Sequence, residues 1–196
     1  MKIGILGGTF DPPHRSHLAL AKHAIKELQL DEVIFIPTWK TPLKSVKIVA
    51  SPQQRLNMLE LMIQNEPCLS LSDIEITRKE ISYTIDTLSE LHVACPAEYW
   101  LLMGSDAALY FMDWKTPEKI SSLCRLAVSL REPHSESQVL SHLPPSIQEK
   151  VDFIHSRTQQ ISSTMIRGSI GQGIIPSHFL NQEVVKYIQT QKLYKL

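Results

Sequence analysis

Two histidines, His14 and His17, stand three residues apart and directly follow a glycine-containing segment, residues 7–13 (GGTFDPP). Residues three apart in a helix face the same side, so both imidazoles can act on one ligand. The N-terminus of a helix presents backbone N–H groups and the positive end of the helix dipole, which favour a bound phosphate. Imidazoles at such a position indicate chemistry on a phosphate group.

The flanking sequence explains how these histidines would be positioned. Residues 2–6 (KIGIL) form an apolar run that is typical of a buried strand. After the histidines, apolar residues recur with helical spacing at Leu18, Ala21, Ile25 and Leu28. We therefore predict a strand, a tight turn and a helix whose N-cap is Ser16.

The glycines and histidines of this segment could also belong to a dinucleotide-binding site, a P-loop or a zinc site. Gly4, Gly7 and Gly8 do not form G-x-G-x-x-G, no acidic residue ends the second predicted strand at 32–37, and no P-loop motif is present. A zinc site at His14 and His17 would need another ligand, for which Asp11 is the candidate. Because the turn presents N–H donors, we expect phosphate contact and no resident metal.

A second polar run, residues 161–167 (ISSTMIR), lies near the other end of the sequence. Taken alone it could be an ordinary helix cap. Consecutive hydroxyl and N–H groups at a helix start also bind phosphate, and Arg167 adds a bidentate donor. The loop 39–44 (WKTPLK) contains two lysines. Lysines in a loop are most often solvated, so this loop could also be an ordinary surface loop.

Strand and helix patterns alternate along the chain. Further strands are expected at 69–76, 99–103, 126–130 and 151–155, and helices begin at Ser51-Pro52, Thr84 and Thr116-Pro117 and again near the end of the chain. This order predicts an α/β fold with a doubly wound, mostly parallel sheet and one domain over residues 1–196. Segment 132–150 is expected to be an irregular surface excursion. In such folds ligands bind at the carboxyl ends of strands, where segments 7–17, 40–44 and 104–106 would lie.

Composition excludes several classes of protein. Lys+Arg and Asp+Glu both number 20, so a general nucleic-acid binder is not expected. No apolar run has transmembrane length, and residues 1–8 do not resemble a secretory signal. The three scattered cysteines indicate reduced, buried thiols and a cytoplasmic protein. The sequence is compatible with a homo-oligomer but does not define the oligomeric state.

The segment 7–17 resembles the Gly-Gly-Thr-Phe-Asp-Pro and His-x-Gly-His signature of the nucleotidylyltransferase superfamily, with Ser16 in place of the usual glycine. Segment 161–167 matches the Ile-Ser-Ser-Thr-x-Ile-Arg motif of the same superfamily. The resemblance implies a Rossmann-like nucleotidyltransferase fold. It implies catalytic roles for His14, His17, Lys44 and Arg167. It implies that ATP is bound by Gly7, Gly8, Thr9, Phe10, Gly104, Asp106, Ile161, Ser162, Ser163 and Thr164.

Two further blocks resemble bacterial nicotinate-nucleotide adenylyltransferases: residues 82–88 (SYTIDTL), and residues 104–106 (GSD) followed by Trp114 and Lys115. This resemblance implies that Tyr83, Thr84 and Trp114 hold a pyridine ring and its carboxylate. The substrates would be ATP, accompanied by Mg²⁺, and nicotinate mononucleotide. The products, nicotinic acid adenine dinucleotide and pyrophosphate, belong to NAD biosynthesis.

Three alternatives remain from the sequence. The chain could be an adenylyltransferase for nicotinamide mononucleotide or for another phosphomonoester such as phosphopantetheine, although the block around Thr84 argues against the latter. It could be a relative of class I aminoacyl-tRNA synthetases, against which the neutral charge and missing RNA-binding appendage argue. It could be a non-catalytic module that binds adenine nucleotides, which would have no reason to keep both histidines together with Lys44 and Arg167.

Overall fold

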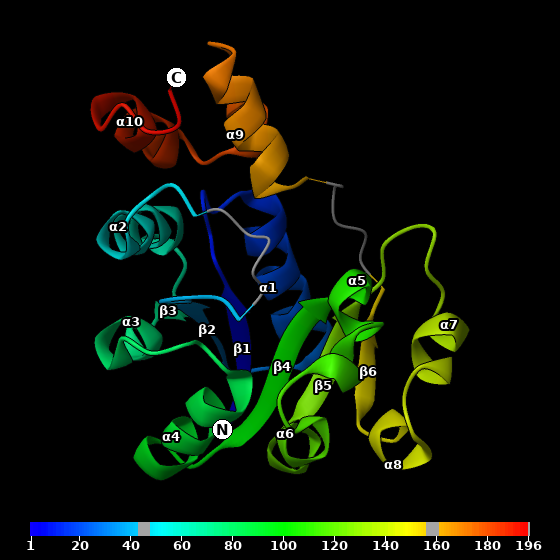
Figure 1. Ribbon diagram of the computed structural model, residues 1–196. Coiled ribbons are helices and arrows are strands. Elements are labelled where there is room, and N and C mark those ends of the chain that lie inside the picture. Colours follow the sequence, from blue (N-terminus) through cyan, green and yellow to red (C-terminus); the bar gives the residue numbers. More distant parts are fainter. Residues whose placement is uncertain (43–47, 156–160, 196) are drawn as a thin grey trace.

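The computed structural model describes residues 1–42, 48–155 and 161–195. Its central feature is a parallel sheet in which the strand order is β3-β2-β1-β4-β5-β6 (Figure 1). The strands are β1 (Lys2–Gly8), β2 (Glu32–Pro37), β3 (Leu69–Leu71), β4 (Glu98–Gly104), β5 (Arg125–Ser129) and β6 (Val151–Ile154). The strand order reverses between β1 and β4, so the predicted doubly wound parallel sheet is confirmed.

Helices cover both faces of the sheet. The core on one face contains residues of α1 (Arg15–Leu28), α2 (Pro52–Ile63), α9 (Ser163–Gly171) and α10 (Gln182–Thr190). The core on the other face contains residues of α4 (Thr84–Ala94), α5 (Ser105–Ala108), α6 (Pro117–Leu123) and α7 (Glu136–Ser141). The remaining short helices are α3 (Ile74–Arg78), η1 (Phe111–Asp113), α8 (Pro145–Gln148) and η2 (Ser177–Phe179).

The side chains of β4 show why two cores form. Successive residues of a strand point to opposite faces. Trp100 and Leu102 accordingly belong to the core beneath α1 and α2, whereas Tyr99, Leu101 and Met103 belong to the core beneath α4 and α6. A strand that is apolar on both sides needs cover on both sides, which the two helix layers supply.

The predicted strand at 69–76 is wrong in its second half. β3 ends at Leu71, and Ile74 begins the short helix α3. The hydroxyl of Thr77 donates to the Asp73 carboxylate at 3.0 Å, and the backbone N–H of Thr77 donates to the Asp73 carbonyl at 2.8 Å. The alternation of two isoleucines was too short to outweigh this local helix-favouring contact.

The expectation of an irregular excursion at 132–150 is also wrong. This segment forms α7 and α8, which lie beside β6 in Figure 1. Val139, Leu143 and Ile147 are buried, at the helical spacing of four residues. Ser135 and Gln138 form a capping box at the start of α7, a sequence signal that prolines at 133, 144 and 145 obscured.

The three cysteines differ in burial. Cys124 is buried, but Cys68 and Cys95 are exposed, so the prediction of three buried thiols is wrong for two of them. Among the helices of the described residues, none combines the length and the apolar character that a membrane span requires.

Candidate active site

The turn after β1 places the histidines at the point where the strand order reverses. Phe10 adopts a left-handed backbone conformation with φ 50° and is 1% exposed. Its ring meets the ring of His17 edge-on, with the centroids 4.9 Å apart. A bulky residue in this conformation is strained, so the surrounding contacts must hold the turn in place.

His14, rather than Ser16, is the N-cap of α1. Ser16 lies inside the first turn of the helix and is buried, which corrects the predicted cap. The rings of His14 and His17 stack with their centroids 3.6 Å apart. The backbone N–H of His14 donates to Nδ1 of His17 at 3.1 Å, so a neutral His17 carries its proton on Nε2.

Both imidazoles are neutral near pH 7. Burial, assisted by the positive charge of Arg131, lowers the pKa of His14 to about 4. Burial, the neighbouring His14 and Arg131 lower the pKa of His17 well below its ordinary value of 6.5. The two rings therefore offer N–H hydrogen bonds to a phosphate rather than full positive charges.

Arg131 lies close enough to His14 and His17 for its charge to act on both, a proximity that the sequence did not establish. Its guanidinium pairs with the carboxylate of Asp106 at 3.4 Å, and its backbone N–H donates to the Ser105 hydroxyl at 3.1 Å. A Cβ on Gly104 would come within 3.3 Å of the guanidinium, so glycine there allows Arg131 to cross the end of β4. Gly7, in contrast to Gly104, faces open space, since no protein atom lies within 4 Å of a Cβ built on it.

Helix α9 brings the second polar run to the same turn. Ser162 caps the helix by accepting the N–H of Met165 at 3.2 Å, and Ser163 donates its hydroxyl to the Pro12 carbonyl at 2.9 Å. Arg167 donates to the Asp11 carbonyl at 2.7 Å and to the Thr164 hydroxyl at 3.2 Å. Ile161 is buried in the core. The two motifs that the sequence singled out thus meet at one place.

His14, His17, Arg131 and Arg167 together form the histidine cluster. Lys44, the remaining predicted catalytic residue, lies outside the described residues.

The carboxylate of Asp11 accepts backbone N–H groups of Val49 and Ala50, which argues against the zinc alternative. In the described part of the chain, no three His, Cys, Asp or Glu residues are grouped as a metal site would require.

Arg55 is a second residue that sequence analysis missed. It is fully buried and donates to the carbonyls of Thr9 at 2.8 Å and Thr38 at 2.6 Å. It therefore ties the turn after β1 to the end of β2. Burial lowers the pKa of Arg55, while the nearby Asp11 acts in the opposite direction.

The aromatic cluster comprises Tyr83, Thr84, Trp114 and Lys115. Thr84 begins α4, as predicted, and the side chain of its N-cap, Tyr83, makes no capping hydrogen bond. Lys115 Nζ lies 4.3 Å from the centre of the Tyr83 ring and 3.1 Å from the Asp86 carboxylate. The ring of Trp114 packs against Phe111 with centroids 5.5 Å apart.

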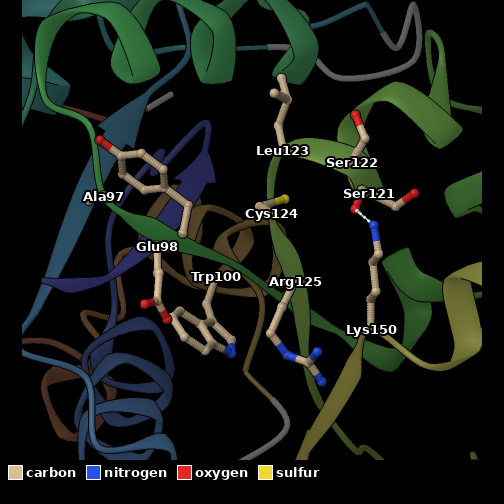
Figure 2. A pocket seen from close by; sticks show the side chains of 10 residues that line it. Ala97, Glu98, Trp100, Ser121, Ser122, Leu123, Cys124, Arg125 and Lys150 are labelled. Atoms are coloured by element: carbon tan, nitrogen blue, oxygen red, sulfur yellow. Dashed lines mark hydrogen bonds between the residues drawn. The ribbon is translucent and has the colours of Figure 1, made fainter.

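A hollow elsewhere on the molecule does not belong to this site. Figure 2 shows it between the beginnings of β4 and β5, where Glu98, Trp100 and Arg125 line it and Lys150 donates to the Ser121 carbonyl at 2.7 Å. These residues lie at the amino ends of the strands. The histidine cluster lies at the carboxyl ends, on the opposite edge of the sheet.

The parallel order and the convergence of the two polar runs define a nucleotidyltransferase of Rossmann-like fold. Residues 5–169 match the cytidylyltransferase-like family. A protein of Herpetosiphon aurantiacus named probable nicotinate-nucleotide adenylyltransferase is 37% identical over 196 residues, covering 98% of each chain. A Lactococcus lactis protein of the same name is 36% identical over 195 residues, covering 99% of this chain and 95% of its own. The chain belongs to the nicotinate-nucleotide adenylyltransferase family within the cytidylyltransferase-like proteins.

A solved structure supports the fold independently. The Plasmodium falciparum nicotinic acid mononucleotide adenylyltransferase complexed with NaAD superposes with a TM-score of 0.82 at 20% identity, covering 98% of this chain and 97% of that one. At this identity the likeness establishes the architecture only.

Proposed function

We propose that the chain transfers the adenylyl group of ATP to nicotinate mononucleotide, forming nicotinic acid adenine dinucleotide and pyrophosphate. The observation that carries this proposal is the convergence of His14 and His17 with Arg131 and Arg167 at the reversal of strand order. Family membership supplies the identity of the reaction. The chain would act in NAD biosynthesis, in the cytoplasm, as one domain over residues 1–196.

The nucleophile would be a phosphate oxygen of the mononucleotide. The second pKa of a phosphomonoester is about 6, so this oxygen is already anionic near pH 7 and needs no general base. It attacks the α-phosphorus of ATP, the bond from that phosphorus to the bridging oxygen breaks, and pyrophosphate leaves with the electron pair. Catalysis then depends on bringing two polyanions into line and stabilising the charge that develops.

The histidine cluster fits that task. Neutral imidazoles donate hydrogen bonds to the α-phosphate, because each carries one N–H. Arg131, Arg167 and the predicted Lys44 would supply the positive charge that the departing pyrophosphate requires. Gly7 would admit the phosphates close to the backbone, since the space beside it holds no protein atom that a Cβ would meet. Gly8 would contribute its backbone, because a Cβ there would come within 3.2 Å of the Phe10 ring.

The adenosine moiety would lie along the edges of the same site, against Thr9, Phe10, Gly104, Asp106 and residues 161–164. Mg²⁺ would be held mainly by the ATP phosphates and water, as is usual for this ion. The described residues fit this arrangement, because they contain no grouped ligands for a dedicated metal site. The ion would offset phosphate charge when bound.

At the aromatic cluster, Trp114 would stack on the pyridine ring. The hydroxyl of Thr84 and the first amides of α4 would donate to the carboxylate, which the helix dipole also favours. This arrangement favours the acid over the amide, and it also argues against phosphopantetheine, which has no planar ring for Trp114.

Pyrophosphate release tests the assignment directly. The protein would be incubated with Mg-ATP and, separately, with nicotinate mononucleotide, nicotinamide mononucleotide or phosphopantetheine. We expect rapid release with the first and formation of the dinucleotide. Release that does not depend on any mononucleotide, or release only with phosphopantetheine, would overturn the proposal.

A further inference from the structure

One buried carboxylate, that of Asp11, joins three separate segments of the chain. Asp11 is 1% exposed and lies three residues before His14. Its Oδ2 accepts the N–H of Val49 at 2.7 Å, and its Oδ1 accepts the N–H of Ala50 at 3.1 Å. The guanidinium of Arg167 lies 4.0 Å from Oδ2 and donates to the carbonyl of the same residue at 2.7 Å.

The third segment is the one that follows α10. The hydroxyl of Tyr194 donates to Oδ1 of Asp11 at 2.8 Å, and this side chain is buried against Met58. Burial and the adjacent carboxylate raise the pKa of Tyr194, so the phenol stays protonated and remains a donor. The contact is between side chains 183 positions apart in the sequence.

The backbone at both ends of this contact is strained. Tyr194 has φ 63°, and Phe10, which precedes Asp11, has φ 50°. Bulky residues adopt this left-handed conformation only where surrounding contacts compensate for the strain. The hydrogen bond between Tyr194 and Asp11 is such a contact, because both side chains are buried and it joins segments far apart in the sequence.

We propose that Tyr194 is a positioning residue for adenylyl transfer, acting through Asp11. By fixing the Asp11 carboxylate, its hydroxyl holds the turn that carries His14 in register with Arg167 and with segment 48–51. Without the hydroxyl, Oδ1 loses its side-chain partner, and the carboxylate can turn toward the Arg167 guanidinium. Arg167 would then be withdrawn from the phosphates. This inference rests on the proposed function, because the displaced groups are those assigned to the phosphates.

Tyr194→Phe tests the proposal, because it removes the hydroxyl and keeps the ring. The matched control is Tyr187→Phe, since the Tyr187 hydroxyl accepts a hydrogen bond from Asn57 at 3.1 Å, away from the turn. Per folded molecule, we expect Tyr194→Phe to lower kcat on the order of tenfold, the effect of one charged hydrogen bond. The KM for nicotinate mononucleotide should stay unchanged, and Tyr187→Phe should keep wild-type kcat.

Amide hydrogen exchange provides a readout that is independent of activity. The N–H groups of Val49 and Ala50 should exchange faster in Tyr194→Phe and not in Tyr187→Phe. Faster exchange in Tyr194→Phe alone would support the contact between Tyr194 and Asp11, whether or not the protein turns over the proposed substrates. Failure of the wild-type protein to turn them over would contradict the proposed function. Unchanged exchange with unchanged kcat, or equal losses in both tyrosine variants, would overturn the positioning role.

A double-mutant cycle with Asp11→Asn tests whether Tyr194 acts through Asp11. Removing both partners should cost less than the sum of the single losses in kcat. Additive losses would show that Tyr194 acts by another route and would overturn the proposal. If Asp11→Asn does not fold, the exchange and kcat measurements on Tyr194→Phe decide alone.

Discussion

The histidine cluster and the aromatic cluster lie along the same edge of the sheet but are held in opposite ways. His14 is 3% exposed, and Asp11, which lies in the same turn outside the cluster, is 1% exposed and contacts residues 49–50, Arg167 and Tyr194. In the aromatic cluster the ion pair between Lys115 and Asp86 has side chains 46% and 39% exposed. Exposed ion pairs contribute little to stability, whereas removing one partner of a buried network is costly.

This difference suggests a division of work between the clusters. In the histidine cluster His14 is buried, while His17, Arg131 and Arg167 are half-buried beside the buried turn at Asp11. Donors fixed in this way are what stabilisation of a transition state requires.

In the aromatic cluster Tyr83, Thr84 and Trp114 are half-buried and Lys115 is exposed. Under the proposed function it would admit and release the ring and discriminate between substituents without carrying the chemistry. Substitutions in the histidine cluster should therefore lower kcat, and substitutions in the aromatic cluster should change the choice of substrate.

The largest expected effect is that of His17→Ala. The loss of a donor at the reacting phosphate should lower kcat by about 10²–10³-fold, while the fold is retained because His17 lies in the first turn of a helix whose Leu20, Ala21 and Ala24 stay packed in the core. Steady-state kinetics with circular dichroism measures both quantities. His17→Asn, which retains an N–H donor, should recover part of the activity. Near-normal turnover of His17→Ala would contradict the role assigned to the histidine cluster.

The second prediction concerns stability as a function of pH. In the folded protein the pKa of His14 is about 4, below its ordinary value of 6.5, so the unfolded chain binds more protons between these values. Stability should therefore be complete above about pH 6.5 and should decline as the pH falls toward 4, by at most about 3 kcal/mol from this residue.

Urea unfolding of wild type and His14→Asn between pH 4 and 7 measures this contribution. The variant should show a shallower loss of stability on acidification, because it lacks the buried imidazole. Identical pH dependence in the two proteins would show that burial of His14 does not have the stated electrostatic consequence.

The sequence predicted the local elements of the molecule better than the tertiary contacts that hold the site. The helix starts at Thr84 and Ser163 and the strand at Glu32–Pro37 follow from local apolar spacing and capping residues. The tertiary contacts of Asp11 could not be predicted in this way, since its partners are two backbone amides and the distant side chains of Arg167 and Tyr194. Arg55 likewise carries no local signal, because its acceptors are carbonyls of distant turns.

The third prediction addresses the aromatic cluster. The ratio of kcat/KM for nicotinate to nicotinamide mononucleotide should be at least roughly tenfold, the scale of one charged hydrogen bond. An amide group would direct its own N–H donors at the Thr84 hydroxyl and the first amides of α4, leaving donors unpaired.

Variants at Thr84 sharpen this test. Thr84→Val removes the hydroxyl and should reduce the preference for the acid, whereas Thr84→Ser keeps the hydroxyl and should retain it. Equal kcat/KM values for the two mononucleotides in the wild-type protein would refute the acid preference and leave the adenylyl transfer reaction in place.

The smallest expected effect is that of Ser16→Gly, which introduces the glycine of the His-x-Gly-His signature that segment 7–17 resembles. Ser16 is buried in the first turn of α1 and is not among the residues with positive φ, so the backbone does not require glycine there. Glycine lowers helix stability by a few tenths of a kcal/mol to about 1 kcal/mol, but it leaves the capping position of His14 unchanged. We therefore expect slightly lower thermal stability with kcat equal to or slightly above that of wild type. Ser16→Ala is the control for the loss of the hydroxyl without the added backbone freedom. A large loss of kcat in both variants would give the Ser16 hydroxyl a role in the histidine cluster, and it would extend that tightly held region by one further residue.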